Sequence, residues 1–177
     1  MAGNGNPHII AYLVHGGGVA WDGFLIMDWL QRLEEILDQR RSQRAFSRQE
    51  LNLEQIGQLT WAAQGITGGD KRWRTSPSAG ALHPLTLYVL LNKTAYRYDP
   101  VEHRLVAHQV IDLAQVVAAA LNQSFIAEAP CNLLFSGNIK RTTRVYKQRG
   151  RDYVCIDLGH AAQNLLLQAV ALGLAAV

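Results

Sequence analysis

Apolar residues recur along the chain with two different spacings, one typical of helices and one typical of strands. A spacing of three to four residues predicts helices at residues 24–39, 53–64, 113–122, 141–147 and 152–174. Short runs of β-forming residues predict strands at 9–14, 85–91, 96–100, 104–108 and 132–136, and the start of another at 175–177. Such a mixture of helices with a few strands indicates an α+β domain.

Local signals mark the beginnings of two of these helices. Asn52 precedes the helix at 53–64, and Gln55 follows three residues later, which is the arrangement of a capping box. Asp112 takes the same N-cap position before the helix that follows it. The segment 152–174 is apolar on nearly every side, so we expect a helix that is buried all round.

Length and composition describe one folded domain with an N-terminal extension. Of the 177 residues, 49% are hydrophobic and 18% charged, which is too apolar for a disordered protein. Residues 1–27 are rich in glycine around a short strand, and we expect them to be an extension to a domain at 28–177. No signal-peptide pattern or membrane-length apolar run is visible, which predicts a cytoplasmic protein. Cys131 and Cys155 lack metal-ligand spacing, so we expect buried thiols and no metal site.

Positive charge is gathered in three places. The net charge of +3 is too small to favour a nucleic-acid-binding protein, and no RNA- or DNA-binding signature accompanies it. Arginines and lysines cluster within residues 40–48, 71–74 and 140–151. Clusters of this kind bind phosphate on small molecules as well as on polymers.

The first of these clusters is a candidate phosphate site. It combines guanidinium groups with a hydroxyl directly after a predicted helix, in Arg40, Arg41, Ser42 and Arg44. Guanidinium forks bind phosphate oxygens in pairs. The plainer interpretation is a solvated helix end whose charge favours the helix dipole.

The loop at residues 74–84 is a candidate ligand-binding loop. Small residues in it would let the backbone approach a flat ligand such as a flavin, namely Pro77, Ser78, Ala79 and Gly80. The alternative is an ordinary turn between a helix and a strand.

A third segment, 157–165, contains a glycine and alanines that let another helix pack close to it. A tightly packed core helix explains the same residues. In either case Gln163 and Asn164 need hydrogen-bond partners, and we expect His160 to be a core histidine rather than an acid or base.

Taken in this order, the segments resemble the nitroreductase superfamily, and within it the SagB-type dehydrogenases, a branch that includes thiazoline/oxazoline oxidases. The resemblance runs from about residue 34 to residue 177 and rests on RRSQRAF, LTWAAQGIT, RTSPSAGALHPLTLYVL, YRYDPVEHRL and GHAAQNLLLQAVALGL. It implies a nitroreductase-like α+β fold, with a central mixed or antiparallel sheet flanked by helices. It also implies an intertwined homodimer with two FMN sites at the interface.

The resemblance assigns both candidate sites to FMN. The phosphate and the pyrimidine edge would meet the arginine-rich group, that is Arg40, Arg41, Ser42 and Arg44. The isoalloxazine ring would be approached from the other subunit by Pro77, Ser78, Ala79 and Gly80. Members of the family use NAD(P)H to reduce FMN, which then reduces a nitro compound, a quinone or a flavin by ping-pong hydride transfer.

The azoline oxidases of the branch run the flavin in the opposite direction and use a Lys-Tyr pair. The corresponding pair here is Val145-Tyr146, so Tyr146 is the candidate catalytic residue and the lysine is replaced. This difference favours an NAD(P)H-driven reductase over an enzyme that oxidises azoline rings in peptides.

Two further hypotheses stay open. Family members continue past the position of Ala175 with a strand, a loop over the flavin and a basic residue at the phosphate, so the sequence predicts a C-terminally short version of the fold. A non-catalytic flavin-binding or degenerate scaffold is therefore the second hypothesis. Residues 15–18 read His-Gly-Gly-Gly, as in the oxyanion element of lipases, but no serine has the glycines of a nucleophile elbow, so a hydrolase is the weakest alternative.

Overall fold

The chain forms two compact units, Met1–Gln39 and Arg40–Val177. The computed structural model describes residues 33–68 and 73–177, and residues 33–39 of the first unit are helical. The strand predicted at 9–14 and the beginning of the helix predicted at 24–39 lie outside the described residues. A boundary between an extension and the domain at residue 27 stays a prediction.

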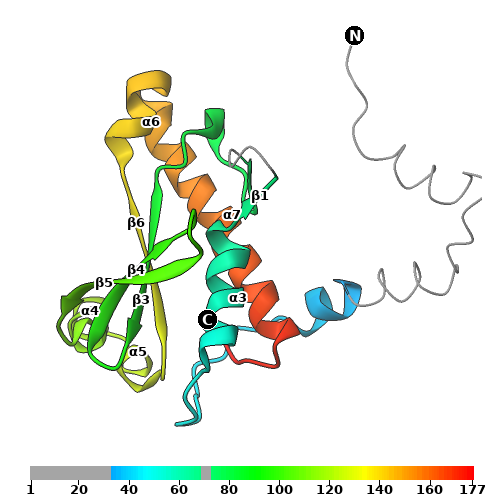
Figure 1. The fold of residues 1–177 in the computed structure, drawn as a ribbon, viewed down its shortest axis with the longest axis vertical. Coiled ribbons are helices and arrows are strands. Elements are labelled where there is room, and N and C mark those ends of the chain that lie inside the picture. The colour runs from blue at the N-terminus through cyan, green and yellow to red at the C-terminus, as the bar shows by residue number, and fades with distance from the viewer. Residues whose placement is uncertain (1–32, 69–72) are drawn as a thin grey trace, which may run out of the picture. The chain divides into compact units, whose positions relative to one another are not determined.

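A four-stranded antiparallel sheet forms one layer of the second unit (Figure 1). In the order β5-β4-β3-β6, it consists of β5 (Arg104–Val110), β4 (Thr94–Asp99), β3 (Leu85–Leu91) and β6 (Asn132–Gly137). β3 is central and pairs with β6 from Leu85↔Gly137 to Leu90↔Asn132. The strands predicted over these residues are confirmed, and the sheet is the antiparallel variant of the one expected.

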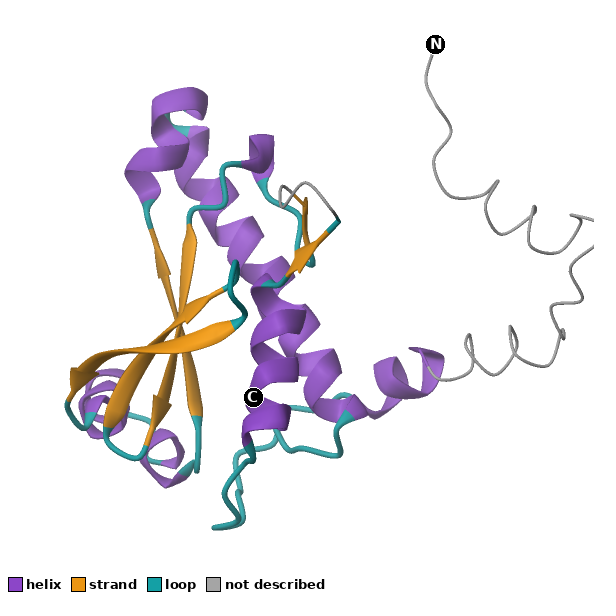
Figure 2. Cartoon of the chain, in the orientation of Figure 1, coloured by secondary structure: helices purple, strands orange, loops and turns teal. Residues whose placement is uncertain are grey.

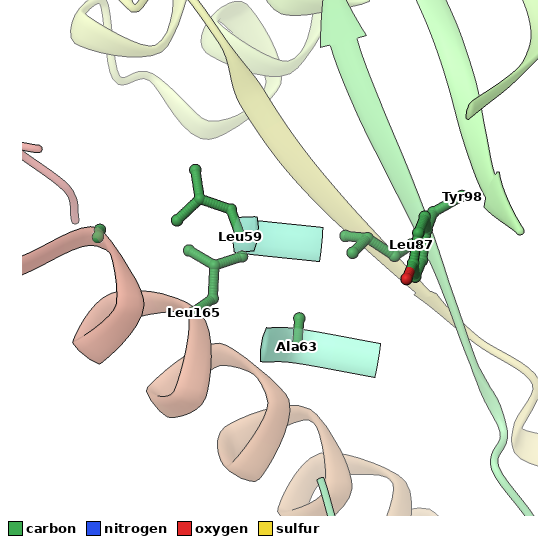
Figure 3. Packing of buried hydrophobic residues seen from close by; sticks show 6 residues of the cluster. Leu59, Ala63, Leu87, Tyr98 and Leu165 are labelled. Atoms are coloured by element: carbon green, nitrogen blue, oxygen red, sulfur yellow. The ribbon is translucent and has the colours of Figure 1, made fainter. Parts of the chain in front are cut away.

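Two helices, α3 (Leu53–Gln64) and α7 (Arg149–Ala171), pack against each other beside the sheet (Figure 2). The core lies between them and the strands, where side chains from both helices meet β3 and β4: Leu59, Ala63, Leu87, Tyr98, Leu165 and Ala169 (Figure 3). The predicted capping box is confirmed, because the Asn52 side chain accepts from the Gln55 amide at 2.8 Å and the Gln55 side chain accepts from the Asn52 amide.

The remaining elements are short. They are β1 (Ile66–Thr67), β2 (Trp73–Arg74), the 3-10 turn η1 (Ala79–Ala81), α4 (Leu113–Leu121), α5 (Phe125–Glu128) and α6 (Ile139–Tyr146). The Asp112 side chain accepts from the Gln115 amide and caps α4 as predicted. The sequence pattern missed α5, β1 and β2 because elements of two to four residues are too short to show a period.

The prediction that α7 is buried on every side is wrong for the chain by itself. One stripe of the helix is buried, but Ile156 is 51% exposed and Leu158 is 37% exposed. Cys155 and His160 also lie on the exposed surface, which contradicts the expectation of a buried thiol and a core histidine. An apolar period shows which residues avoid water, but not whether the same chain or a second molecule covers them.

Candidate functional site

The loop at residues 74–84 is fastened to the end of α3 by buried polar side chains. Ser76, which is 3% exposed, donates to the carbonyl of Ala63 and accepts from the Gln64 side chain at 3.0 Å. The Arg74 guanidinium donates to the carbonyl of Gln64 at 2.9 Å. These bonds satisfy polar groups at the C-terminal end of α3 and fix the entry to the loop.

A second set of bonds fastens the same loop to α7. The Ser78 hydroxyl donates to Asp157 Oδ2 at 2.6 Å, and the Ala79 amide donates to Asp157 Oδ1 at 3.3 Å. Ser78 Oγ also accepts from the His83 amide at 2.9 Å, which closes the turn on itself. Two helical turns further along α7, the Asn164 side chain donates to the carbonyl of Thr75 at 3.0 Å.

Asp157 is a site residue that sequence reasoning did not assign. Its carboxyl is 4% exposed and is bound by the hydroxyl and amide of the loop. The expectation that Asn164 needs a partner is confirmed, whereas Gln163 is exposed and reaches water. The spacing along the sequence could have identified Asp157, because Asp157 and Asn164 are seven residues apart and so lie on one face of the helix.

The candidate catalytic tyrosine lies against the glycine of the loop. Gly80 has a φ of +60°, and a Cβ atom built on it would lie 2.6 Å from Tyr146 Oη. The Tyr146 ring packs edge-on against Tyr153, with 4.9 Å between the ring centroids. The structure therefore brings Tyr146 together with the predicted group Pro77, Ser78, Ala79 and Gly80, which the sequence could not establish.

Arg74 begins the loop, and Tyr98 of β4 lies near it in the core. Burial lowers the pKa of the Arg74 guanidinium, and the nearby Tyr98 side chain opposes this shift. Burial raises the pKa of the Tyr98 phenol, whose hydroxyl lies 2.8 Å from His103 Nδ1. Tyr98 is consequently a neutral hydrogen-bonding group in the core at neutral pH.

The arginine-rich group is held in a different way. Its backbone runs beside the end of the chain, where Ser42 forms a parallel bridge with Ala176 and the Gln43 amide donates to the Ala176 carbonyl at 2.9 Å. The side chains of Arg41, Ser42 and Arg44 are exposed. The Arg44 guanidinium lies 5.8 Å from the centroid of the Phe125 ring in α5.

Within one chain the two predicted halves of the cofactor site do not meet. The loop contacts α7 at Asp157, whereas the arginine-rich group pairs with a residue beyond Leu172, where α7 has ended. Fifteen residues of α-helix separate those two positions, which corresponds to roughly 22 Å. In Figure 1, α6, which brings Tyr146 to the loop, and α5, which carries the Phe125 ring near Arg44, lie at opposite ends of β6.

A cavity of about 890 Å³ lies near the arginine-rich group, between α4, α5, β6 and the last residues of the chain. Its lining is mostly apolar, and Phe46 and Phe125 belong to it. Cys131 also lines it, and burial raises the pKa of this thiol to about 11, so the thiol is neutral at physiological pH. The cavity therefore offers space and apolar contact rather than a reactive thiolate.

Within the described residues, no group of three or more His, Cys, Asp or Glu side chains is arranged to hold a metal ion. The same part of the chain contains no helix long and apolar enough to cross a membrane.

Comparison with known proteins gives one consistent result. The profile of the nitroreductase family matches residues 37–177. A nitroreductase-like protein of Methanocaldococcus jannaschii is 39% identical over 155 residues, which cover 82% of this chain and 77% of that protein.

Solved structures agree with the sequence relatives. A nitroreductase-like protein of Ralstonia eutropha JMP134 is 31% identical, with a TM-score of 0.71 over 80% of this chain and 66% of its own. The chain thus spans about two thirds of the length of that relative. A chain of the Escherichia coli microcin synthetase McbBCD complex, solved with truncated pro-MccB17 bound, has a TM-score of 0.63 at 16% identity and covers 98% of this chain and 71% of its own. At that identity the likeness shows the fold alone.

Proposed function

Because the chain belongs to the nitroreductase family, we propose that it is a cytoplasmic FMN-dependent oxidoreductase that uses NAD(P)H to reduce nitro, quinone or flavin-type acceptors. The observation that carries the proposal is the meeting of Tyr146 with the loop at Gly80. A proton-bearing side chain and an exposed backbone loop are two parts that flavin chemistry needs in one place.

The loop fits the edge of a flavin. Ser78 and Ala79 are half-buried, and their conformation is already set by Asp157. Gly80 is exposed, and its lack of a Cβ lets the Tyr146 hydroxyl approach the backbone of the loop closely. We assign Pro77, Ser78, Ala79 and Gly80 to the isoalloxazine ring on these grounds.

The arginine-rich group fits the phosphate of FMN. Guanidinium groups that are exposed or part-exposed stand next to a serine hydroxyl and supply charge-assisted donors, and we assign Arg40, Arg41, Ser42 and Arg44 to this role. Since one chain keeps this group roughly 22 Å from the loop along α7, the assignment requires a second chain.

A homodimer would supply the missing half of each site. The exposed face of α7 carries Ile156 and Leu158, and a Cβ built on Gly159 would have no atom within 4 Å. Exposed apolar side chains beside a glycine are suited to the close approach of a second helix. We therefore propose a two-fold dimer packed along α7.

The bound FMN would supply a two-electron carrier that accepts hydride from NAD(P)H and passes it to the acceptor. The chain itself would position the ring with the loop at Gly80 and neutralise the phosphate with Arg40 and its neighbours. Tyr146 would carry a proton on Oη beside the loop. It would donate this proton to the acceptor when the acceptor is reduced.

An absorbance spectrum of the purified full chain tests this function. Flavin bands that bleach when NADPH or NADH is added under nitrogen would establish a working flavoenzyme. A colourless protein that takes up no added FMN would overturn the proposal and favour a non-catalytic scaffold.

Oxidation of azoline rings in peptides is the second candidate, because Tyr146 occupies the position expected for that chemistry. The residue before it is Val145, which is 57% exposed, and the Lys147 ammonium donates to the Arg144 carbonyl at 3.2 Å. Valine therefore stands in the place of the lysine of the pair, and the nearby Lys147 ammonium is bonded to the backbone of α6. If the protein oxidises an azoline-containing peptide in the absence of NAD(P)H, azoline oxidation becomes the favoured function and acceptor reduction the second candidate.

A further inference from the structure

Exposed cations cover α6 and the first turn of α7. The group consists of Lys140, Arg141, Arg144, Lys147, Arg149 and Arg151, all of them exposed. Asp152 is the one acidic residue between positions 138 and 152. None of the six cations forms an ion pair with a carboxylate in the part of the chain that the structure describes. We call this group the cationic face.

Packing fixes the positions of two of these cations. The Arg141 guanidinium donates to the carbonyls of Leu82 and His83, at 3.3 and 2.8 Å, and so connects α6 to the loop at residues 74–84. The Arg149 guanidinium lies 6.0 Å from the centroid of the Tyr153 ring, which itself packs on Tyr146. An arginine held on an aromatic ring keeps its charge and loses less freedom when it binds an anion.

The cationic face also borders the proposed flavin site. Tyr146 is the last residue of α6 and contacts Gly80 in the loop, and α6 lies at the same end of the unit as the start of α7 (Figure 1). A molecule that delivers hydride to a ring at Gly80 would therefore extend over a surface of unneutralised positive charge.

From this juxtaposition we propose that the cationic face binds the phosphate groups of the nicotinamide donor and selects NADPH over NADH. The inference rests on the proposed function, because it assumes that the donor docks at the loop. NADPH differs from NADH by a phosphate monoester on the adenosine ribose, which carries a charge of about −1.5 to −2 at neutral pH. Arginines bind such a group through paired hydrogen bonds, and the field of the cationic face raises its local concentration.

The first test is a calorimetric titration of the full chain with adenosine 2′,5′-bisphosphate and with adenosine 5′-monophosphate. We expect the bisphosphate to bind at least about threefold more tightly, since exposed charge pairs contribute modestly. The variant Arg144→Gln/Arg149→Gln should lose that difference, whereas Lys93→Gln, in the turn between β3 and β4, should keep it. Equal affinities for the two nucleotides in the unaltered protein would overturn the inference, whatever the variants do.

The second test measures flavin reduction by each donor at low and at high salt. We expect a larger kcat/KM for NADPH, by about three- to tenfold at low salt, and a smaller difference at high salt because the charges are screened. If NADPH and NADH reduce the flavin-loaded protein at equal rates, the inference is wrong, but the proposed function is unaffected. A protein that binds no flavin would overturn the proposed function and, with it, the role of NADPH as hydride donor. The titration would then show only whether the cationic face prefers a 2′-phosphate.

Discussion

The two candidate parts of the cofactor site are built in opposite ways. Residues 74–84 are bonded to α3 and α7 through buried side chains, among them Ser76 and Asp157. The arginine-rich group is held by its backbone beside Ala176, with exposed side chains. The loop is therefore positioned by buried hydrogen bonds, whereas the arginine side chains make contacts at the surface, such as those of Arg41 with the Arg40 carbonyl and of Arg44 with the Phe125 ring.

This difference separates two tasks that a cofactor site performs. A flavin ring needs a fixed surface, because its position relative to the donor and acceptor decides the chemistry. A phosphate needs charge, which tolerates some movement of the side chains that supply it. Changes to the loop and to its anchor on α7 should accordingly reduce flavin retention more than changes to the arginines.

Gly80→Val should have the largest effect on flavin binding. A side chain here would have to adopt a φ of +60°, and its Cβ would lie 2.6 Å from Tyr146 Oη. The left-handed conformation alone costs about 1–2 kcal/mol for a residue with a Cβ. We expect the variant to lose FMN on gel filtration while it stays folded by circular dichroism.

Gly57→Ala is the matched control for this variant. A Cβ at Gly57 in α3 would meet His103 at an ordinary contact distance of 3.6 Å. Alanine favours a helix over glycine by about 1 kcal/mol, so this control should keep its flavin and melt slightly higher. If Gly80→Val keeps its full content of FMN, the loop does not belong to the FMN site.

Asp157→Ala should have the next largest effect. It removes the acceptor of the Ser78 hydroxyl and of the Ala79 amide. An unmet donor in a part-buried position costs about 1–3 kcal/mol, so we expect a lower melting temperature together with a Kd for FMN raised about tenfold or more.

Asp152→Ala, an exposed change in the first turn of the same helix, is the control for Asp157→Ala. Asp157→Asn should fall between the two, since its amide oxygen can still accept from Ser78. If melting temperature falls in Asp157→Ala but the Kd for FMN does not change, Asp157 supports the fold and does not position the cofactor.

Arg40→Ala should weaken flavin binding without moving the loop. The expected loss is one charge-assisted phosphate contact at the lower end of its range, about 1.5 kcal/mol, because water screens a part-exposed guanidinium; this corresponds to a rise in Kd of roughly tenfold or less. Quenching of FMN fluorescence measures it, and Arg48→Ala serves as a control with the same change of charge nearby in the sequence. The same Kd in both variants would mean that net charge, rather than a particular contact, attracts the phosphate.

Much of the fold follows from local signals in the sequence. The capping box at Asn52 and Gln55 and the cap at Asp112 place α3 and α4, because these side chains act on backbone groups three residues away. The turn after Asp99 joins β4 to β5 as expected. Such signals need no knowledge of the rest of the chain.

The site depends on contacts that local signals do not contain. Ser78 and Asp157 lie 79 residues apart, and neither the loop composition nor the helical period of α7 indicates that they pair. The exposure of Ile156 was missed for the same reason, since an apolar period does not say what covers it. The candidate residues came from a resemblance, and only the three-dimensional arrangement brings Tyr146 to Gly80.

Tyr146→Phe should have the smallest effect on flavin retention. The variant removes Oη and keeps the ring that packs edge-on against Tyr153, so the Kd for FMN should stay within about twofold. Turnover should fall instead, because a positioned proton donor contributes to the rate and not to ground-state binding of the flavin. Stopped-flow kinetics separates the two half-reactions, and the loss should appear when the acceptor is reduced. Tyr96→Phe, on β4, loses a hydroxyl in the sheet and should match the unaltered protein. If Tyr146→Phe turns over at the normal rate, Tyr146 serves only to pack α6 against the loop, and solvent delivers the proton to the acceptor.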